Sequence, residues 1–156
     1  MNTVALAVRP TSAWHPSTWV HELLERQRTL ALFGLALLAG LLPLLVLHGL
    51  DDRSLRGVGV WVKPIKFFAS SALFALTTAW LVGLLPRERR RDGLVRLLVV
   101  LLVATALFEN GYITWQAALG EASHYNVGDR FHALMYQAMG AAALLLTFTQ
   151  PMLAWQ

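Results

Sequence analysis

The sequence predicts an all-α integral membrane protein in which four antiparallel helices form a bundle. The first observation is composition: 56% of the 156 residues are hydrophobic and 14% are charged, whereas soluble domains carry about 25% charged residues. The second is that the chain holds four apolar stretches of about 20 residues, the length of helix that crosses a bilayer. Because there is no cysteine, disulfides and thiolate metal sites are excluded.

Short polar segments separate the four expected spans. In chain order the spans are Leu30–Leu50, Ile65–Leu85, Leu94–Leu119 and Phe131–Trp155. We expect Pro43 to kink the first span, Pro86 to stop the second and Gly120 to cap the third. Pro64 suits the first turn of the second span, and it biases Lys63 toward an extended conformation. Connections this short place consecutive helices antiparallel.

The residues before the first span form an N-terminal segment, 1–29, in front of the bundle at 30–156. Within it, residues 17–28 (STWVHELLERQR) are typical of a short amphipathic helix with Ser17 as its cap. Trp14 and Trp19 suit the boundary between membrane and water. We therefore expect this helix to lie at the membrane interface.

Arginine supplies nearly all of the net charge of +4, and its distribution predicts orientation. The loop 87–92 (RERRRD) holds four arginines, and Arg26 and Arg28 precede the first span on the same side. The other side carries a sparser set, Arg53, Arg56, Lys63, Lys66 and Arg130. The positive-inside rule then predicts that both termini are cytoplasmic. Because the arginines flank spans, we expect no nucleic-acid partner.

A polar stripe runs along the third expected span. Thr105, Glu109, Tyr112 and Gln116 follow at intervals of four, three and four residues, so they share one helix face, which we expect to point into the bundle. An ionisable residue inside a span is costly and suggests function. Glu109 is therefore the candidate catalytic residue. The alternative is an ion pair with Lys66 that only fixes helix register.

Further polar residues belong to the same membrane side as this stripe. Lys66, Ser70 and Thr77 share a face of the second span that we also expect to point inward. Lys63 and Lys66 suit an anionic group; alternatively, they extend toward the headgroups as interfacial lysines do. The full set of candidate ligand-binding residues is Lys63, Lys66, Tyr112, Gln116, His124, Asn126 and His132.

Three histidines raise the question of a metal or a haem. His48, His124 and His132, together with Glu109 or Asp129, could ligate a metal, and two histidines from separate spans could ligate haem. The sequence contains neither H-E-x-x-H nor a repeated histidine pattern. We therefore predict no metal and no cofactor.

Two motifs give the chain a resemblance to a known group of proteins. Residues 63–67 read KPIKF, and residues 109–126 read E-x-x-Y-I-x-x-Q-A-x-x-G-x-x-S-H-Y-N. Over these segments the chain resembles uncharacterised small bacterial four-span membrane proteins with the motifs K-P-x-K-F, E, Q-A-x-x-G and S-H-F-N. Tyr125 replaces their phenylalanine, and Leu119 stands where the family often has arginine. The resemblance implies that these polar residues belong together and that the chain lies in a bacterial inner (plasma) membrane, and it carries no activity.

The sequence therefore predicts an externally facing polar pocket for an amphiphilic or lipid-like molecule, and it leaves open whether the protein also processes that molecule. Two other classes remain: a structural or accessory subunit of a larger membrane complex, and a small oligomeric transporter. Expected partners are membrane lipids, the amphiphile, and further copies or subunits. There is no phosphate-binding glycine loop and no nucleophile elbow.

Overall fold

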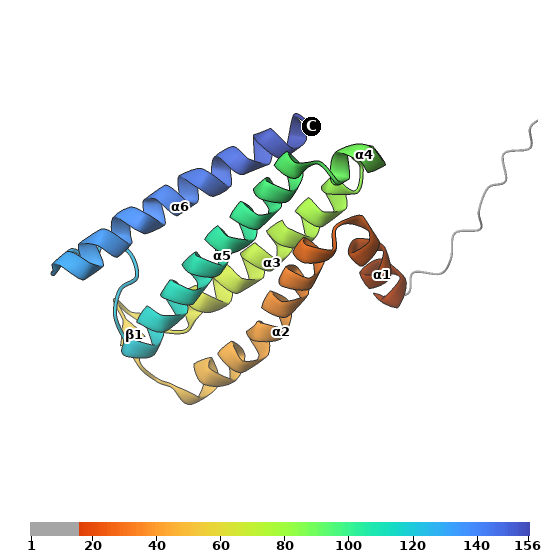
Figure 1. Ribbon diagram of the computed structural model, residues 1–156. Coiled ribbons are helices and arrows are strands. Elements are labelled where there is room, and N and C mark those ends of the chain that lie inside the picture. Colours follow the sequence, from red (N-terminus) through yellow and green to blue (C-terminus); the bar gives the residue numbers. More distant parts are fainter. Residues whose placement is uncertain (1–15) are drawn as a thin grey trace, which may run out of the picture.

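The computed structural model describes residues 16–156, most of which lie in helices (Figure 1). Four helices are long and apolar enough to cross a membrane. They are α2 (Arg28–Leu50), α3 (Val62–Val82), α5 (Gly93–Leu119) and α6 (Arg130–Ala154). Consecutive helices run in opposite directions along the bundle. The predicted all-α bundle with four spans is confirmed.

The N-terminal helix α1 (Pro16–Arg26) packs across one end of α2 and α3. Trp19 stacks on Trp80 with ring centroids 5.1 Å apart. The guanidinium of Arg26 lies 3.8 Å from the centroid of the Trp80 ring and donates a hydrogen bond to the Trp80 carbonyl at 3.3 Å. This helix is thus held to the bundle by aromatic and cation–π contacts as well as by apolar packing.

The boundaries of α1 differ slightly from those expected. The helix begins at Pro16, so Ser17 lies in its first turn instead of preceding it. Gln27 separates α1 from α2, and its side-chain oxygen accepts a hydrogen bond from the backbone N–H of Leu30 at 3.0 Å. Residues 1–15, including Trp14, lie outside the described residues. Further along, α2 continues through Pro43 to Leu50.

Helices α2 and α3 approach each other closely at glycines. A Cβ atom on Gly34 would lie 2.7 Å from Cγ of Leu76 and 3.2 Å from the backbone oxygen of Ala72. A Cβ on Gly40 would lie 2.8 Å from the ring of Phe68. Small residues therefore permit this close helix pair, as is common between membrane helices.

Gly34→Ala and Gly49→Ala should have opposite effects, although both glycines lie in α2. The Gly34 change inserts a methyl group against α3 and should lower the free energy of unfolding by about 1–3 kcal/mol. A Cβ on Gly49 meets nothing within 4 Å, so the same change there should raise stability by about 0.5–1 kcal/mol through helix propensity. Thermal unfolding in detergent measures both. Equal effects would contradict the close approach at Gly34.

The loop between α2 and α3 contains a small hairpin that the sequence analysis did not identify. Strands β1 (Ser54–Leu55) and β2 (Val58–Gly59) pair antiparallel. Both loop residues have positive φ, 54° at Arg56 and 79° at Gly57, as a type I′ hairpin turn requires. The expected extended conformation of Lys63 is wrong, because α3 already begins at Val62. Pro64 fits this first turn because its missing N–H would have no helical partner.

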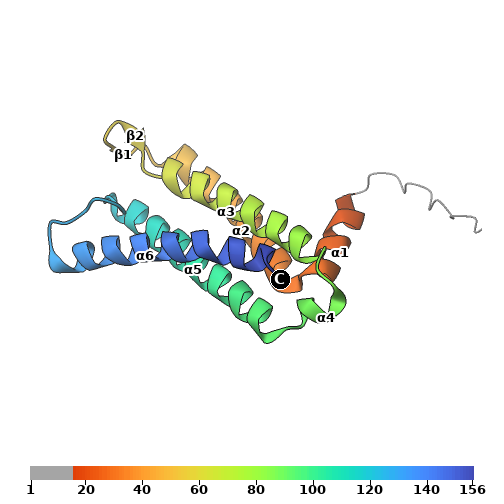
Figure 2. The ribbon, with the colours of Figure 1, turned by 90° about the horizontal axis from the view of Figure 1, so that it is seen from above.

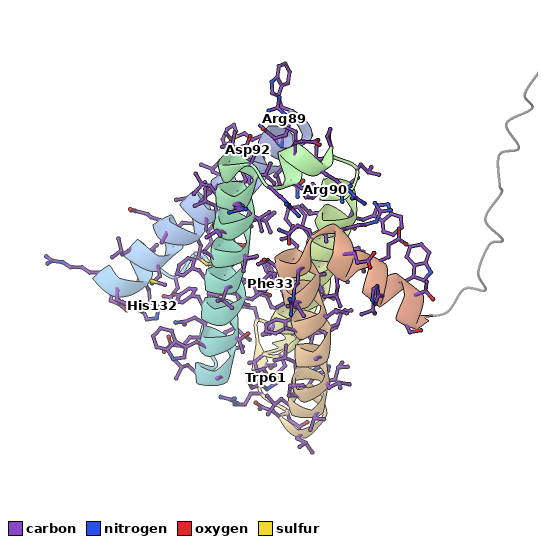
Figure 3. The ribbon with its side chains drawn as sticks, turned by 45° about the vertical axis from the view of Figure 1, so that its right-hand side comes forward. Phe33, Trp61, Arg89, Arg90, Asp92 and His132 are labelled. Atoms are coloured by element: carbon purple, nitrogen blue, oxygen red, sulfur yellow. The ribbon has the colours of Figure 1, made fainter. Side chains whose placement is uncertain are left out.

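At the arginine-rich end of the bundle, an arginine side chain binds the carbonyl groups that follow the end of α3. Helix α3 ends at Val82, earlier than the expected Leu85, and Pro86 precedes the short helix α4 (Arg87–Arg90). Arg90 donates hydrogen bonds to the carbonyl of Leu85, at 2.8 Å, and to that of Gly83. Figure 3 shows Arg89, Arg90 and Asp92 at this end, with Trp61 and His132 toward the other.

Helix α6 is the least buried of the four spans. Of the most apolar 18 consecutive residues in each span, 11% are buried in α6, against 28–39% in the other three spans. It lies along α5, and near the C-terminus Gln150 Nε2 donates a hydrogen bond to Thr78 Oγ1 of α3 at 2.7 Å. Figure 2 shows the hairpin and the loop before α6 at the end of the bundle away from α4 and the C-terminus.

Candidate functional site

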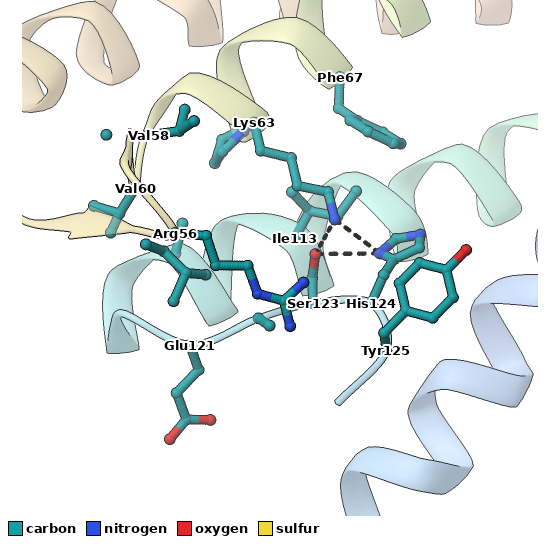
Figure 4. Close-up of a pocket in the computed structure, with 15 residues that line it drawn as sticks. Arg56, Val58, Val60, Lys63, Phe67, Ile113, Glu121, Ser123, His124 and Tyr125 are labelled. Carbon is teal, nitrogen blue, oxygen red and sulfur yellow. Dashed lines mark hydrogen bonds between the residues drawn. The ribbon is translucent and has the colours of Figure 1, made fainter. Parts of the chain in front are cut away.

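A pocket of about 450 Å³ opens at the hairpin end of the bundle, where four parts of the chain meet (Figure 4). Its volume lies within the range of about 300–1,000 Å³ common for small-molecule sites. The hairpin, the first turns of α3, one face of α5 and the loop after α5 form its wall. The lining residues are Leu55, Arg56, Val58, Gly59, Val60, Lys63, Pro64, Phe67, Ile113, Ala117, Glu121, Ala122, Ser123, His124 and Tyr125.

A network around Asp51 holds the hairpin side of the pocket in place. Its carboxylate accepts a hydrogen bond from Trp61 Nε1 at 2.7 Å and pairs with the Arg53 guanidinium, also at 2.7 Å. Arg53 also donates to the carbonyl of Ala118 at 3.0 Å, which ties this loop to the end of α5. Hydrogen bonds from Arg53 and Trp61 hold the pKa of Asp51 well below its usual range. The carboxylate therefore stays charged, and the link persists, at neutral pH.

On the other side, the pocket wall is positioned by the end of α5. Gly120 caps this helix with φ of 76°, a left-handed conformation, and this confirms the predicted cap. The chain then turns back over the bundle, and Tyr125 also has positive φ, 57°. This turn brings Ser123 and His124 opposite the first turn of α3.

The polar centre of the pocket consists of Lys63, Ser123 and His124. The Lys63 ammonium donates to Ser123 Oγ at 2.5 Å and lies 2.9 Å from His124 Nδ1. Ser123 Oγ is 3.2 Å from the same nitrogen. Figure 4 shows the Lys63 side chain reaching from α3 to both partners. Each distance is short enough for a hydrogen bond.

The charge state of this cluster follows from burial. Burial, and secondarily the nearby Lys63 charge, lowers the pKa of His124. The imidazole is therefore neutral at pH 7, and its Nδ1 accepts from Lys63, so the proton is assigned to Nε2. Among residues 16–156, Lys63 forms no ion pair. A half-buried positive charge thus faces the pocket with two neutral partners.

Apolar and aromatic groups surround this centre. The Lys63 ammonium lies 5.8 Å from the centroid of the Phe67 ring, and that ring is 6.3 Å from His124. Tyr125 packs on Tyr136 of α6 with centroids 5.1 Å apart. The pocket therefore combines the Lys63 cation, and that of Arg56 on the hairpin, with the Glu121 carboxylate and a largely apolar wall, an arrangement suited to a molecule with a charged and an apolar part.

The predicted stripe on α5 lies beside this pocket and not in its lining. Thr105, Glu109, Tyr112 and Gln116 are all buried, as expected from their spacing. The hydroxyl of Tyr112 and both polar atoms of the Gln116 side chain are buried, and none of them has a hydrogen-bond partner in the part of the chain that the structure describes. The pocket is lined instead by two other α5 residues, Ile113 and Ala117.

The expected inward face of α3 is wrong. Lys66, Ser70 and Thr77 are exposed, because α3 turns a different face, with Ala72, Ala75 and Ala79, into the core. No ion pair joins Lys66 to Glu109, although both residues are described.

Glu109→Leu and Lys66→Met should therefore have additive effects on stability. Residues without contact or shared partners usually combine to within about 0.5 kcal/mol. Thermal unfolding of the wild type, both single variants and the double variant in detergent completes the cycle. A coupling of more than about 1 kcal/mol would mean that the two side chains meet in the membrane.

His132 and Asn126 lie near the pocket without lining it. His132 Nδ1 is 2.5 Å from Asp129, and Nε2 is 3.0 Å from Glu121. Asp129 also caps α6 by accepting from the His132 backbone N–H at 3.0 Å, and this hydrogen bond is the main reason that its pKa is lowered. These contacts connect the loop after α5 to the start of α6.

The three histidines discussed as metal or haem ligands have separate surroundings. His124 contacts Lys63, His132 contacts two carboxylates, and His48 lies beside Gly59 of the hairpin. Within residues 16–156, no group of three His, Asp or Glu side chains could hold a metal ion.

Sequence analysis did not select Ser123 or Arg56 as site residues. Ser123 does stand in the S-H-Y-N segment beside His124, so the motif contained the signal. The sequence around Arg56 contains no such motif. Arg56 lines the pocket because the hairpin turn places it there. Comparison of the chain with protein-family models, with curated proteins and with solved structures finds no match.

The cluster predicts a pH dependence of stability. Because the pKa of His124 is lowered in the folded protein, the unfolded chain binds a proton at about pH 6.5 where the folded one does not. The contribution of His124 to stability should therefore be lost as the pH drops below about 6.5. Melting temperatures between pH 8 and pH 5 test this. His124→Gln should flatten that decline, and equal curves for wild type and His124→Gln would contradict the assignment.

Proposed function

We propose that this membrane protein binds an amphiphile with an anionic head group in the pocket at the hairpin end. One observation carries the proposal: Lys63 presents an ammonium group that has no acidic partner among residues 16–156, in a largely apolar pocket at the end of a span. A charge that is partly removed from water and not compensated favours an anionic ligand. The start of α3 adds the positive end of a helix dipole.

The shape of the pocket supports the same class of ligand. Phe67, Ile113 and Val60 provide apolar surface beside the cation, which suits an alkyl chain next to the head group. Glu121 also lines the pocket, but its carboxylate contacts His132 and not Lys63. The roles of Glu109, Tyr112, Gln116, Lys66, Asn126 and His132 in ligand binding stay predictions from the sequence.

Native mass spectrometry of the protein purified in a neutral maltoside detergent tests the proposal. Dodecyl phosphate and dodecyltrimethylammonium have the same chain and opposite charges. We expect one dodecyl phosphate to bind per chain and the cationic analogue to bind far more weakly. Equal binding of the two would show that the chain alone is recognised and would overturn an anion site at Lys63.

The second candidate is a subunit of a homo-oligomer or of a larger membrane complex. The low burial of α6, less than half that of any other span, favours it, because a span that makes few contacts within its own chain has surface left for another. The same mass spectra report the stoichiometry. A monomer after mild extraction would count against this candidate.

The proposed orientation places the pocket on the outer side of a bacterial inner membrane and both termini in the cytoplasm. Its support is the arginine-rich segment at the opposite end of the bundle. Glu88→Cys and Val127→Cys put thiols at exposed positions at the two ends. An impermeant thiol reagent added to intact cells should label Val127→Cys alone. Labelling of Glu88→Cys alone would reverse the orientation and leave the binding proposal unchanged.

A further inference from the structure

Ser123 is placed as an enzyme nucleophile would be. It is 5% exposed, and it provides the one aliphatic hydroxyl group among the residues that line the pocket. Its Oγ lies 2.5 Å from an ammonium nitrogen and 3.2 Å from an imidazole nitrogen. A serine hydroxyl is a weak nucleophile unless a neighbouring base takes its proton, and both a base and a cation are within reach here.

We propose that Ser123 attacks the acyl carbon of an ester-linked amphiphile with an anionic head group, so that the pocket is the active site of an acyl hydrolase. The inference rests on the proposed function, because the anionic head group is what Lys63 recognises. It identifies the class of bond acted upon, a carboxylic ester, and it gives roles to Ser123, His124 and Lys63.

His124 is the general base of the first step. Its Nδ1 has a single in-plane lone pair, so it accepts from Lys63 or from Ser123 but not from both. In the free protein the ammonium lies closer to Nδ1, at 2.9 Å against 3.2 Å for Ser123 Oγ. An anionic head group that draws the Lys63 ammonium toward itself leaves Nδ1 free for the serine proton. Binding of the right ligand thus activates the nucleophile.

The steps balance without a cofactor. Ser123 Oγ forms a bond to the carbonyl carbon, and its proton passes to His124 Nδ1. The bond from that carbon to the alkoxy oxygen breaks, and the alcohol leaves with the proton from His124. Water then adds to the acyl group on Ser123 with His124 again as base, and this step releases a carboxylic acid and the free serine. Lys63, which lies beside Oγ in the free protein, then lies between the head group and the reacting ester and stabilises the negative charge that develops on the substrate oxygen.

The experiment uses a dodecyl fluorophosphonate, which forms a stable adduct with an activated serine. The detergent-solubilised full chain is treated with the probe, digested and examined by mass spectrometry. We expect one adduct, on Ser123, and none in Ser123→Ala. His124→Gln should slow labelling by about 100-fold or more, as loss of a general base does. Ser70→Ala removes an exposed hydroxyl on α3 outside the pocket and should label at the wild-type rate.

Dodecyl phosphate binding, measured on the same samples, separates this inference from the function on which it rests. Wild type that binds dodecyl phosphate but carries no adduct on Ser123 would overturn the hydrolase and leave the binding protein. An adduct that forms equally fast in His124→Gln would also overturn the proposed chemistry. Failure of wild type to bind dodecyl phosphate would overturn both. The two outcomes measured on the wild type stay decisive even if a variant fails to fold.

Discussion

Lys63→Met is expected to weaken the binding of dodecyl phosphate by about 10- to 100-fold. The substitution keeps an unbranched side chain of similar length, so the apolar contacts of the pocket are retained while the charge is lost. A hydrogen bond to a charged group contributes about 1.5–3 kcal/mol, and about 1.4 kcal/mol corresponds to a factor of ten in affinity. Titration followed by native mass spectrometry, or by tryptophan fluorescence, measures the change.

Lys66→Met is the matched control for this prediction. Lys66 lies three residues along the same helix, carries the same charge and is exposed outside the pocket. Its loss should change affinity by less than a factor of about three, since an exposed charge is screened by solvent. If the two variants weaken binding equally, the ligand is attracted by general surface charge, and Lys63 has no special role.

Gln116→Leu is expected to raise the free energy of unfolding by about 2–4 kcal/mol. The side chain is 1% exposed, and its amide nitrogen and oxygen both lack a hydrogen-bond partner. A buried polar group without a partner costs about 1–3 kcal/mol, and leucine of similar size removes two such groups at once. Thermal or denaturant unfolding in detergent measures the effect.

Gln137→Leu provides the comparison on an exposed face of α6. A change at this surface should alter stability by no more than about 0.5 kcal/mol. If Gln116→Leu instead lowers stability, the amide has a partner in the membrane, such as bound water or the ligand itself. That outcome would support the prediction, made from the place of Gln116 on the α5 stripe, that this residue binds the ligand.

The buried stripe on α5 illustrates what residue spacing along the chain can predict. Intervals of four, three and four residues put Thr105, Glu109, Tyr112 and Gln116 on one face, and that face is buried, because helix geometry alone decides which residues share a side. The same reasoning failed on α3, where Lys66, Ser70 and Thr77 share an exposed face. Periodicity groups residues correctly, but it cannot say which side of a helix its neighbours will cover.

The pocket depended on contacts between distant parts of the chain. Lys63 and His124 were selected from the sequence, but their meeting with Ser123 across about 60 residues results from the packing of α3 against α5. The hairpin that closes the pocket was missed, because a two-residue strand pair has no period to detect and its turn uses Arg56-Gly57 in place of the common Asn-Gly.

The sequence by itself determined that this protein is a helical membrane protein with four spans, because bilayer thickness sets span length and apolar composition sets burial in lipid. It also determined the cap at Gly120, where one residue type satisfies a local backbone need. Only the tertiary structure decided that Lys63 faces Ser123 and His124 while Lys66, one turn later, faces outward. That choice depends on which helix surfaces fit together, and such fit is a property of several helices at once.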